Sequence, residues 1–192
     1  MTQAARWGDE VRRLDLAVYR AVAATPTPQI DGALRRLSQA ANHSKLSMAV
    51  AGALALAGGA RGRRAAVVGL ASVAVTSASA NLVAKLAWRR SRPDREAGGV
   101  VVERHVTMPT SSSFPSGHSA AAFAFATGVG HEWPAVGVPL RGLAAVVAYS
   151  RVHTGVHYPG DVIAGSLLGG VLGQVTAHTL QRRWTWPGPA SS

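Results

Sequence analysis

Cysteine is absent from this chain of 192 residues, which excludes several kinds of chemistry. Without a thiol the protein has no disulfide bond, no thiolate zinc site, no iron–sulfur cluster and no cysteine nucleophile. The same absence leaves the redox compartment undetermined. The length fits a single domain, since a chain of this size rarely divides into two independent hydrophobic cores.

Acidic residues are scarce as well. Nine Asp and Glu residues stand against 20 Lys and Arg residues, which gives a formal net charge of +11. Such an excess is typical of proteins that bind a polyanion, either nucleic acid or an anionic membrane surface. Only 15% of the residues are charged, however, and 47% are hydrophobic, an unusual combination for a soluble nucleic-acid-binding protein. Composition alone therefore leaves both partners open.

Long stretches of the sequence carry no charge. Residues 46–60 and 65–84 contain no Lys, Arg, Asp or Glu, and residues 162–181 repeat the pattern over 20 positions. A helix of 20 residues spans about 30 Å, the hydrocarbon thickness of a bilayer. Residues 105–131 also lack a full charge, and residues 133–150 carry only Arg141. These runs indicate helices that cross a membrane.

We therefore expect an all-α fold, an integral-membrane helical bundle of about five transmembrane helices. The expected helices lie near residues 45–60, 65–90, 117–130, 136–150 and 160–180, with a tight basic turn at residues 61–64. The alternative is a soluble bundle with Ala-rich buried helices, but two uncharged runs of 20 residues are rare in soluble chains.

Small residues recur on one face of the last expected helix. Gly165, Gly169 and Gly173 are spaced four apart, a pattern that lets two helices approach closely in lipid. Two interpretations stay open. The stripe packs against another helix of the same bundle, which we favour, or it forms a homo-oligomer contact.

The first 44 residues differ from the rest of the chain. Apolar and basic residues alternate in a helical pattern there, and Pro26-Thr27-Pro28 separates two amphipathic segments, with Asp31 in the first turn of the second. We interpret residues 1–44 as amphipathic interfacial helices that lie on anionic headgroups. They do not form a signal peptide, because no apolar core follows the first basic residues. Residues 182–192, with Trp184 and Trp186, are expected to form a flexible tail with an interfacial anchor.

A first polar cluster follows the second uncharged run. Lys85 and Arg92 are seven positions apart, so a helix that continued to Pro93 would carry both cations on one face. Basic clusters at a membrane edge usually contact lipid headgroups. The spacing alone therefore leaves two hypotheses, headgroup contact and the binding of a phosphate.

A second cluster precedes the apolar run that begins at residue 120. Ser116 fits the N-cap of a helix there, and Gly117 permits a close approach to the backbone. The free N–H groups of the first turn would then face an anion, and His118 could give a proton to it. The alternative is a capping serine beside an interfacial histidine. A serine nucleophile is disfavoured because the G-x-S-x-G elbow is absent.

A third cluster lies between the last two uncharged runs. Pro159 is well placed to open a helix, with Asp161 in its first turn and His157 just before it. A carboxylate near an imidazole holds one nitrogen protonated and leaves the other free to attack an electrophile. His153 and His157 have the spacing of zinc ligands. A zinc site is disfavoured, because no Glu lies between them and no third ligand is evident.

Together the three clusters resemble the signatures of the type 2 phosphatidic acid phosphatase superfamily, integral-membrane lipid phosphatases that share a fold with vanadium haloperoxidases. The first signature, Lys-x6-Arg-Pro, corresponds to Lys85 and Arg92-Pro93, and the second, Pro-Ser-Gly-His, to residues 115–118. The third, Ser-Arg-x5-His-x3-Asp, corresponds to Ser150-Arg151, His157 and Asp161. The ordered set is highly specific and covers about residues 65–180.

The resemblance implies a role for each matched residue. His157 attacks phosphorus to form a phosphohistidine, Asp161 holds the tautomer of His157, and His118 protonates the leaving oxygen and then activates water. The phosphoryl oxygens are bound by Lys85, Arg92, Arg151, Ser116 and the Gly117 amide. Neither a metal nor a cofactor is expected, because the cations supply the positive charge. His105, His131 and His153 match no catalytic position of the family.

The implied activity is metal-independent hydrolysis of a lipid phosphate or diphosphate by a membrane-embedded phosphatase domain at residues 45–181. Candidate substrates are phosphatidic acid, a phosphatidylglycerophosphate, a polyprenyl diphosphate and a prenyl-linked sugar phosphate. The main alternative is a lipid phosphotransferase that passes the phosphohistidine to an alcohol. A vanadium haloperoxidase is disfavoured because those relatives are larger and soluble, and the intact motifs argue against a binding protein with a relict site.

The expected partners are the lipid phosphate and the bilayer, not nucleic acid, in a multi-pass protein of the cell membrane. Five spans would place the amino terminus and all three clusters on one face. Counting basic residues would make that face cytoplasmic. That count loses force, however, because some of these cations are assigned to phosphate binding and the interfacial helices do not report the topology. Relatives that recycle prenyl carriers often work on the extracytoplasmic face, which we slightly favour.

Overall fold

The computed structural model describes residues 3–86 and 90–183, apart from the side chains of residues 4, 5 and 83–86. This part of the chain is all-α, as the sequence predicts. The α-helices are α1 (Gln3–Ala24), α2 (Pro28–Ala40), α3 (Lys45–Ala57), α4 (Gly59–Leu86), α5 (Gly117–Glu132), α6 (Pro134–His153) and α7 (Pro159–Arg183). Two short 3-10 turns, η1 (Asn42–Ser44) and η2 (Val102–Arg104), lie in the connections.

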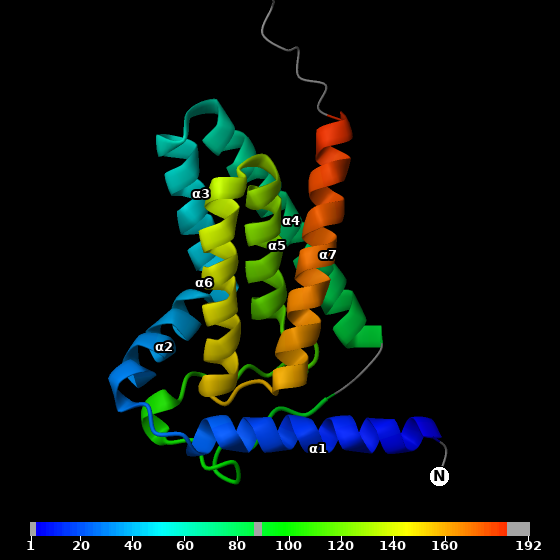
Figure 1. Ribbon diagram of the computed structural model, residues 1–192. Helices are drawn as coiled ribbons and strands as arrows, with labels where there is room; N and C mark the ends of the chain where they lie inside the picture. Colours follow the sequence, from blue (N-terminus) through cyan, green and yellow to red (C-terminus); the bar gives the residue numbers. More distant parts are fainter. Residues whose placement is uncertain (1–2, 87–89, 184–192) are drawn as a thin grey trace, which may run out of the picture.

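Helices α3 to α7 stand side by side as an upright bundle, and α1 lies across one end of it (Figure 1). We call this end the site end and the opposite end the far end. Helix α2 slopes from the site end toward the start of α3, and the break between α1 and α2 falls at the predicted Pro-Thr-Pro sequence. Asp31 lies in the first turn of α2, also as predicted.

Three helices are long and apolar enough to cross a membrane, namely residues Gly59–Leu82 of α4, all of α6 and all of α7. Helices α3 and α5 have 13 and 16 residues, fewer than the about 20 residues of a typical span. The predicted count of about five spans is therefore not confirmed by length and composition, although at least three spans are available.

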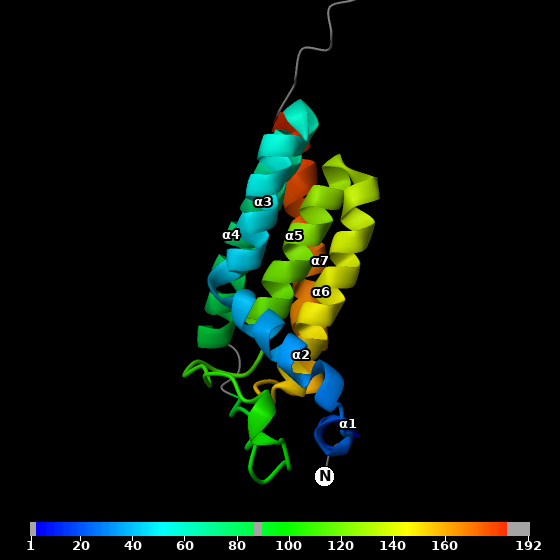
Figure 2. The ribbon, with the colours of Figure 1, turned by 90° about the vertical axis from the view of Figure 1, so that its left-hand side faces the viewer.

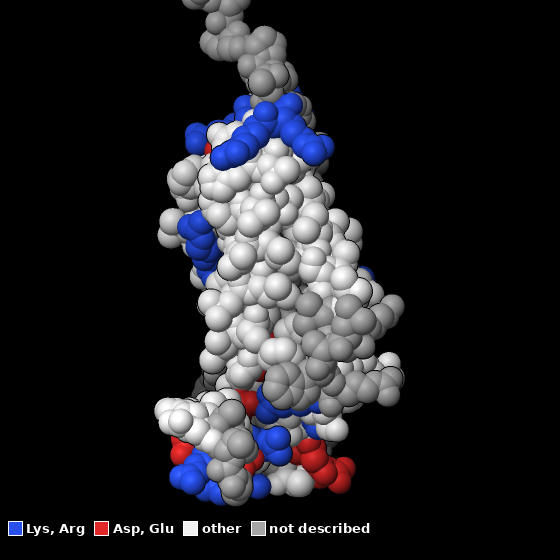
Figure 3. Space-filling model, turned by 90° about the vertical axis from the view of Figure 1, so that its right-hand side faces the viewer, with Lys and Arg blue, Asp and Glu red and all other residues white. Residues whose placement is uncertain are grey.

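The charged side chains lie mainly at the two ends of the bundle. On the face shown in Figure 3, basic residues gather at the far end, and acidic and basic residues mix at the site end. The surface between them is largely uncharged. A band of this kind fits the hydrocarbon layer of a membrane, with charges placed near the headgroups on each side.

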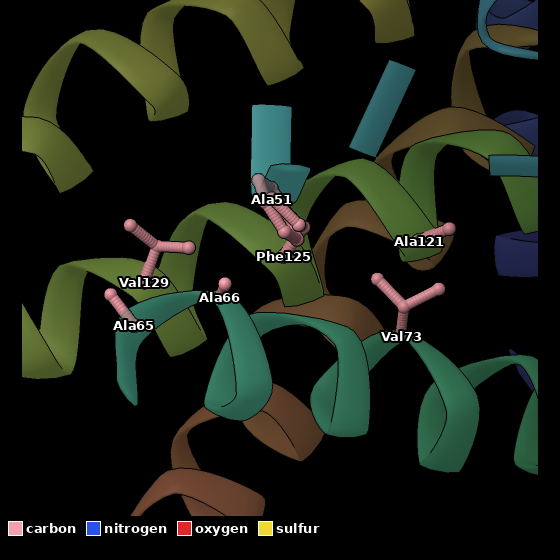
Figure 4. Packing of buried hydrophobic residues seen from close by; sticks show 7 residues of the cluster. All are labelled: Ala51, Ala65, Ala66, Val73, Ala121, Phe125 and Val129. Carbon is pink, nitrogen blue, oxygen red and sulfur yellow. The ribbon is translucent and has the colours of Figure 1, made fainter. Parts of the chain in front are cut away.

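Helix α5 forms the centre of the bundle and packs against α4, α6 and α7. Its apolar residues Ala121, Phe125 and Val129 meet Ala51 of α3 and Ala65, Ala66 and Val73 of α4 in one buried cluster (Figure 4). Most members of this cluster are alanine or valine, so the helix axes come close together. Helices that are only weakly hydrophobic thus gain stability from contact area between close backbones.

The predicted glycine stripe of α7 packs inside the same chain. Gly165, Gly169 and Gly173 are buried, and a Cβ atom at each would meet the backbone of Ser116, Ala120 or Ala124 along α5. The stripe therefore packs against another helix of the same bundle, which is the interpretation that we favour from the sequence. The second, a homo-oligomer contact through these glycines, needs an exposed stripe and is wrong for the arrangement observed.

Replacing Gly169 with alanine should destabilise the protein, because the new methyl group would meet the carbonyl oxygen of Ala120 and push α5 and α7 apart. Overpacking of this kind costs about 1–3 kcal/mol. The matched control is Gly170→Ala on the same helix, where nothing lies within 4 Å of the new atom. That control should gain up to about 1 kcal/mol from helix propensity. Thermal unfolding in detergent micelles compares the two variants, and equal midpoints would contradict the packing argument.

Two local predictions are wrong. The turn between α3 and α4 lies at Gly58 and Gly59, the latter with a φ of +58°, and the basic residues 61–64 lie in the first two turns of α4. Arg64 pairs there with Glu132 at 3.3 Å, which favours the helical conformation. Helix α7 also continues through Arg183, past the predicted start of the tail at residue 182. Residues 184–192, with the predicted tryptophan anchor, lie outside the described residues.

Candidate active site

The predicted site residues come together at the site end of the bundle. Helix α5 begins there, α6 ends there and α7 begins there, so Ser116–His118, Arg151 and Asp161 approach one another from three helices (Figure 1). The long connection between α4 and α5 hangs below the same end (Figure 2) and brings Arg92 to it. The exception is Lys85, whose side chain lies outside the described residues.

His157 lies in the short connection between α6 and α7 and is 1% exposed. Its Nε2 atom is 3.2 Å from a terminal nitrogen of Arg92. A guanidinium group can only donate, so Nε2 must accept. The neutral imidazole therefore carries its proton on Nδ1, and the lone pair of Nε2 faces a cation.

Asp161 lies beside the other nitrogen of this imidazole. Its Oδ2 atom is 3.6 Å from Nδ1 of His157, and the same oxygen accepts hydrogen bonds from the Ser113 hydroxyl and from the Tyr158 N–H. The Ser113 oxygen is itself 3.5 Å from Nδ1. The carboxylate thus supports the predicted tautomer at a distance longer than a hydrogen bond, with Ser113 placed beside both groups.

Arg92 is held by the backbone of two connections. It donates to the carbonyl oxygens of Ser111, Ser112 and Val156 at 3.0, 3.2 and 2.8 Å. The prediction that Lys85 and Arg92 share one helical face is wrong, since residues 90–94 are non-helical. Pro93 disfavours the helical conformation of the residue before it. The guanidinium reaches His157 from an extended segment.

Arg151 lies in the last turn of α6 and is 1% exposed. One of its terminal nitrogens donates to both the carbonyl and the hydroxyl oxygen of Ser38, on α2, at 3.0 and 2.6 Å. Its Nε is buried and has no hydrogen-bond partner among the described residues. A buried donor without a partner is costly, so this edge of the guanidinium is suited to an anionic ligand.

Ser116 is the N-cap of α5, as predicted, and its hydroxyl accepts from the N–H of Ser119 at 3.4 Å. Its own N–H donates to the Asp161 carbonyl at 2.9 Å, so the cap ties α5 to α7. Gly117 is exposed, with open space where a side chain would stand. His118 follows it, and its Nε2 is 2.8 Å from the amide oxygen of Asn42 in η1.

Sequence reasoning missed the partners that hold the matched residues. They are Asp15, Ser38, Asn42, Arg90 and Ser113. Asn42 and Ser38 come from segments interpreted only as interfacial helices, and no spacing rule links them to residues more than 70 positions away. One backbone feature marks the region: His43 and Ser44, next to Asn42, both have positive φ, at 55° and 56°. Adjacent strained residues of this kind gather at functional sites.

The histidines without a family role have structural partners. His153 contacts the Asp31 carboxylate at 2.9 Å, His105 the Val100 carbonyl at 3.0 Å and His131 the Gln181 amide at 2.8 Å. Among residues 3–86 and 90–183, no group of three or more His, Asp or Glu side chains is placed to hold a metal ion.

An apolar hollow lies one helical turn away from the site. It is shallow, with a volume of about 20 Å³, and is lined by residues of α3, α5 and α6. Ala122 in its wall lies four residues after His118, and Val147 lies four residues before Arg151. A hydrocarbon chain lying against this surface would have its polar end close to the cations.

Burial lowers the pKa of His157 below its usual value near 6.5, and the charge of Arg92 acts in the same direction, against the contact with Asp161. Because a lowered pKa keeps the neutral form at lower pH, the imidazole should remain a free base throughout neutral pH and gain a proton only on acidification past 6.5. NMR of histidine-labelled protein, assigned with His157→Gln, measures this titration. A midpoint above 6.5 would contradict the prediction.

Comparisons with known proteins identify the family of this chain. Residues 64–185 match the family model described as PAP2 superfamily. A decaprenylphosphoryl-5-phosphoribose phosphatase of Mycobacterium tuberculosis is 38% identical over 168 residues, 85% of this chain and 89% of that protein. A lipid A 1-phosphatase of Rhizobium etli is 36% identical over 105 residues, 54% of this chain and 45% of that protein.

The fold has a solved counterpart. The crystal structure of a PAP2 type phosphatidylglycerolphosphate phosphatase from Bacillus subtilis superposes with a TM-score of 0.71, covering 93% of this chain and 90% of that one, at 20% sequence identity. The family match covers more than half of the chain and contains all three polar clusters. The chain therefore belongs to the PAP2 superfamily and is a membrane lipid phosphatase.

Proposed function

We propose that the protein removes the terminal phosphate of a prenyl-linked sugar phosphate through a phosphohistidine on His157. The observation that carries the chemistry is the state of His157: a buried imidazole whose Nε2 lone pair is directed at a guanidinium, with a carboxylate on the other side. A phosphoryl group held by that guanidinium would lie within reach of the lone pair.

The proposed reaction has two steps. Nε2 of His157 attacks phosphorus, the bond from phosphorus to the leaving oxygen breaks, and His118 gives that oxygen a proton. Water then attacks the phosphohistidine, His118 takes a proton from the water, and phosphate leaves as the nitrogen–phosphorus bond breaks. Asp161 stabilises the imidazolium character that develops at His157.

Cations and helix-end amides are proposed to hold the phosphoryl oxygens. Arg92 and Arg151 flank His157, and the free Nε of Arg151 offers a donor. Gly117 is at the first turn of α5, where backbone N–H groups lack partners within the helix. Ser116 contributes as the cap that fixes this turn, since its own N–H is used by Asp161. Lys85 is assigned to the same cradle by its place in the motif.

The substrate class rests on similarity and on the hollow. The mycobacterial relatives, matched over most of their length, are phosphatases of decaprenylphosphoryl-5-phosphoribose, a prenyl-linked sugar phosphate. The apolar hollow beside Ala122 and Val147 supplies a surface for the prenyl chain. A sugar between chain and phosphate would then lie near His118 and Asn42.

The proposed membrane arrangement has five spans, α3 to α7, with α1 and α2 at the interface. Helix α5 has only 16 residues, but it is packed between α4, α6 and α7 and so has little surface to match to the lipid. The face proposed for the site is extracytoplasmic, which places the basic residues 61–64 of the far end in the cytoplasm. Single cysteines introduced there should resist a membrane-impermeant maleimide in whole cells, and labelling of intact cells would reverse the orientation.

The test of the activity is phosphate release from a panel of lipids in detergent micelles with excess chelator. The panel contains a prenyl-linked phosphoribose, phosphatidylglycerophosphate, phosphatidic acid and a polyprenyl diphosphate. We expect the first to give a kcat/KM at least about tenfold above the others, a difference of about 1.4 kcal/mol in transition-state binding. Preference for another lipid overturns the substrate class, dependence on added magnesium overturns the metal-independent chemistry, and a phosphorylated alcohol as product assigns the phosphotransferase alternative.

A further inference from the structure

Helix α1 contributes one buried carboxylate to the site end of the bundle. Most of this helix is exposed, including Trp7, Val11 and Leu14 at 61%, 61% and 66%. Asp15 is different, with 7% exposure. A charged residue that is buried in an otherwise exposed helix needs a partner, and its partners identify what it does.

Asp15 reaches the first turn of α7 by two routes. Its Oδ1 accepts a hydrogen bond from the N–H of Gly160 at 2.7 Å, and its Oδ2 accepts one from a terminal nitrogen of Arg90 at 2.5 Å. The second terminal nitrogen of Arg90 donates to Oδ1 of Asp161 at 2.8 Å. The guanidinium also lies over the ring of Tyr158, 4.1 Å from its centre. A carboxylate, a guanidinium and a second carboxylate thus connect α1 to the residue beside His157.

The chain of contacts divides the oxygens of Asp161 between two tasks. Oδ1 faces Arg90, and Oδ2 faces Ser113, Tyr158 and the imidazole. Arg90 therefore fixes one oxygen of the carboxylate, while Ser113 and Tyr158 hold the other. The side chain of Arg90 is 25% exposed, so burial alone does not fix its orientation. The ion pair with Asp15 holds the planar guanidinium in place.

We propose that Asp15 is a positioning residue of the phosphatase site, which through Arg90 fixes Asp161 and thereby the orientation of His157. The inference rests on the proposed function for its kinetic test, and it makes α1 a part of the active site in addition to a surface helix. The contacts of Asp15 are with Arg90 and the Gly160 N–H, both of which adjoin Asp161, so its effect should pass through the placement of Asp161.

The first test compares Asp15→Asn with Glu10→Gln, an exposed acidic residue of the same helix. We expect Asp15→Asn to lower kcat by about 10- to 100-fold, the range in which loss of an outer hydrogen-bond partner weakens other histidine sites. KM should change by less than about threefold, because substrate binding does not involve Asp15. Glu10→Gln should retain the parent kcat, and Asp15→Glu should recover part of the loss. An Asp15→Asn enzyme with the parent kcat overturns the proposal.

The second test asks whether the effect passes through Asp161. In an Asp161→Asn background, Asp15→Asn should change the residual rate by less than about twofold, since two substitutions in one network are not additive. Multiplied losses in the double variant would mean that Asp15 acts elsewhere, for example on folding alone. Thermal unfolding of each variant identifies any that fail to fold.

The third test needs no substrate. Loss of the Asp15 charge leaves Asp161 less firmly placed beside His157, so the NMR titration midpoint of His157 should move to lower pH in Asp15→Asn and stay in place in Glu10→Gln. An unmoved midpoint in Asp15→Asn overturns the positioning role even if no lipid of the panel is hydrolysed. Failure of the panel alone, with the midpoint moved, counts against the proposed function and supports the positioning role.

Discussion

Replacing His157 with glutamine should abolish phosphate release, with a loss of roughly four orders of magnitude or more, as in other enzymes that lose a covalent nucleophile. Glutamine is similar in size but cannot form a nitrogen–phosphorus intermediate. The parent enzyme should also retain protein-bound phosphate after rapid alkaline quenching with a phosphorus-labelled substrate, whereas the variant should retain none. The fraction of labelled protein and the steady-state rate are both measured in micelles.

The matched control is His178→Gln on α7, at the far end of the bundle, where the ring contacts Gln174 at 2.7 Å. This variant should keep the parent rate, because it lies away from the site end. A His157→Gln enzyme that still turns over substrate within tenfold of the parent would assign the nucleophile to another group.

Arg151→Lys should lower kcat by about 10²- to 10³-fold, the loss that follows removal of one donor to a developing oxyanion. The Arg151 guanidinium is buried, uses one nitrogen to contact Ser38 twice, and keeps its Nε free. An ammonium is a single point of charge and cannot hold Ser38 and a phosphoryl oxygen in the same plane. Lysine therefore restores the charge without restoring the geometry.

Arg141→Lys on the exposed side of α6 is the control for the same exchange in the same helix. Its kinetics should match those of the parent. Vanadate, as a mimic of the pentacoordinate transition state, should inhibit the parent much more strongly than Arg151→Lys. Equal inhibition of both would mean that Arg151 does not contact the phosphoryl group.

Much of the fold follows from the sequence because its determinants are local. The uncharged runs, Pro28, Pro159 and the Ser116 cap fix where helices α2, α5 and α7 begin, and each effect acts within a few residues. Boundaries were missed where glycines compete with basic residues for a turn, as at Gly58 and Gly59. The non-helical conformation of residues 90–92 was missed because hydropathy does not register how a following proline disfavours the helix.

The matched site residues could be selected from the sequence because the three motifs are short and ordered. The residues that hold these site residues in place could not be selected from the sequence. Ser38 holds Arg151 across 113 positions, Asn42 holds His118 across 76 positions, and Asp15 meets Gly160 across 145 positions. Each of these supports lies in a segment whose pattern indicates only an amphipathic helix. Such contacts depend on how helices dock, which periodicity does not encode.

The shortness of α3 has a consequence for the depth at which a lipid meets the enzyme. With 13 residues this helix is about 20 Å long, against about 37 Å for the 25 residues of α7. In the proposed five-span arrangement, the apolar belt is therefore narrower beside α3, and the bilayer must thin there to match it. Thinning moves the nearby headgroups inward, toward the start of α3, where Asn42 meets His118. In that arrangement a lipid arriving on this side would present its phosphate without leaving the bilayer plane, and the hydrophobic mismatch of one helix would become part of substrate delivery.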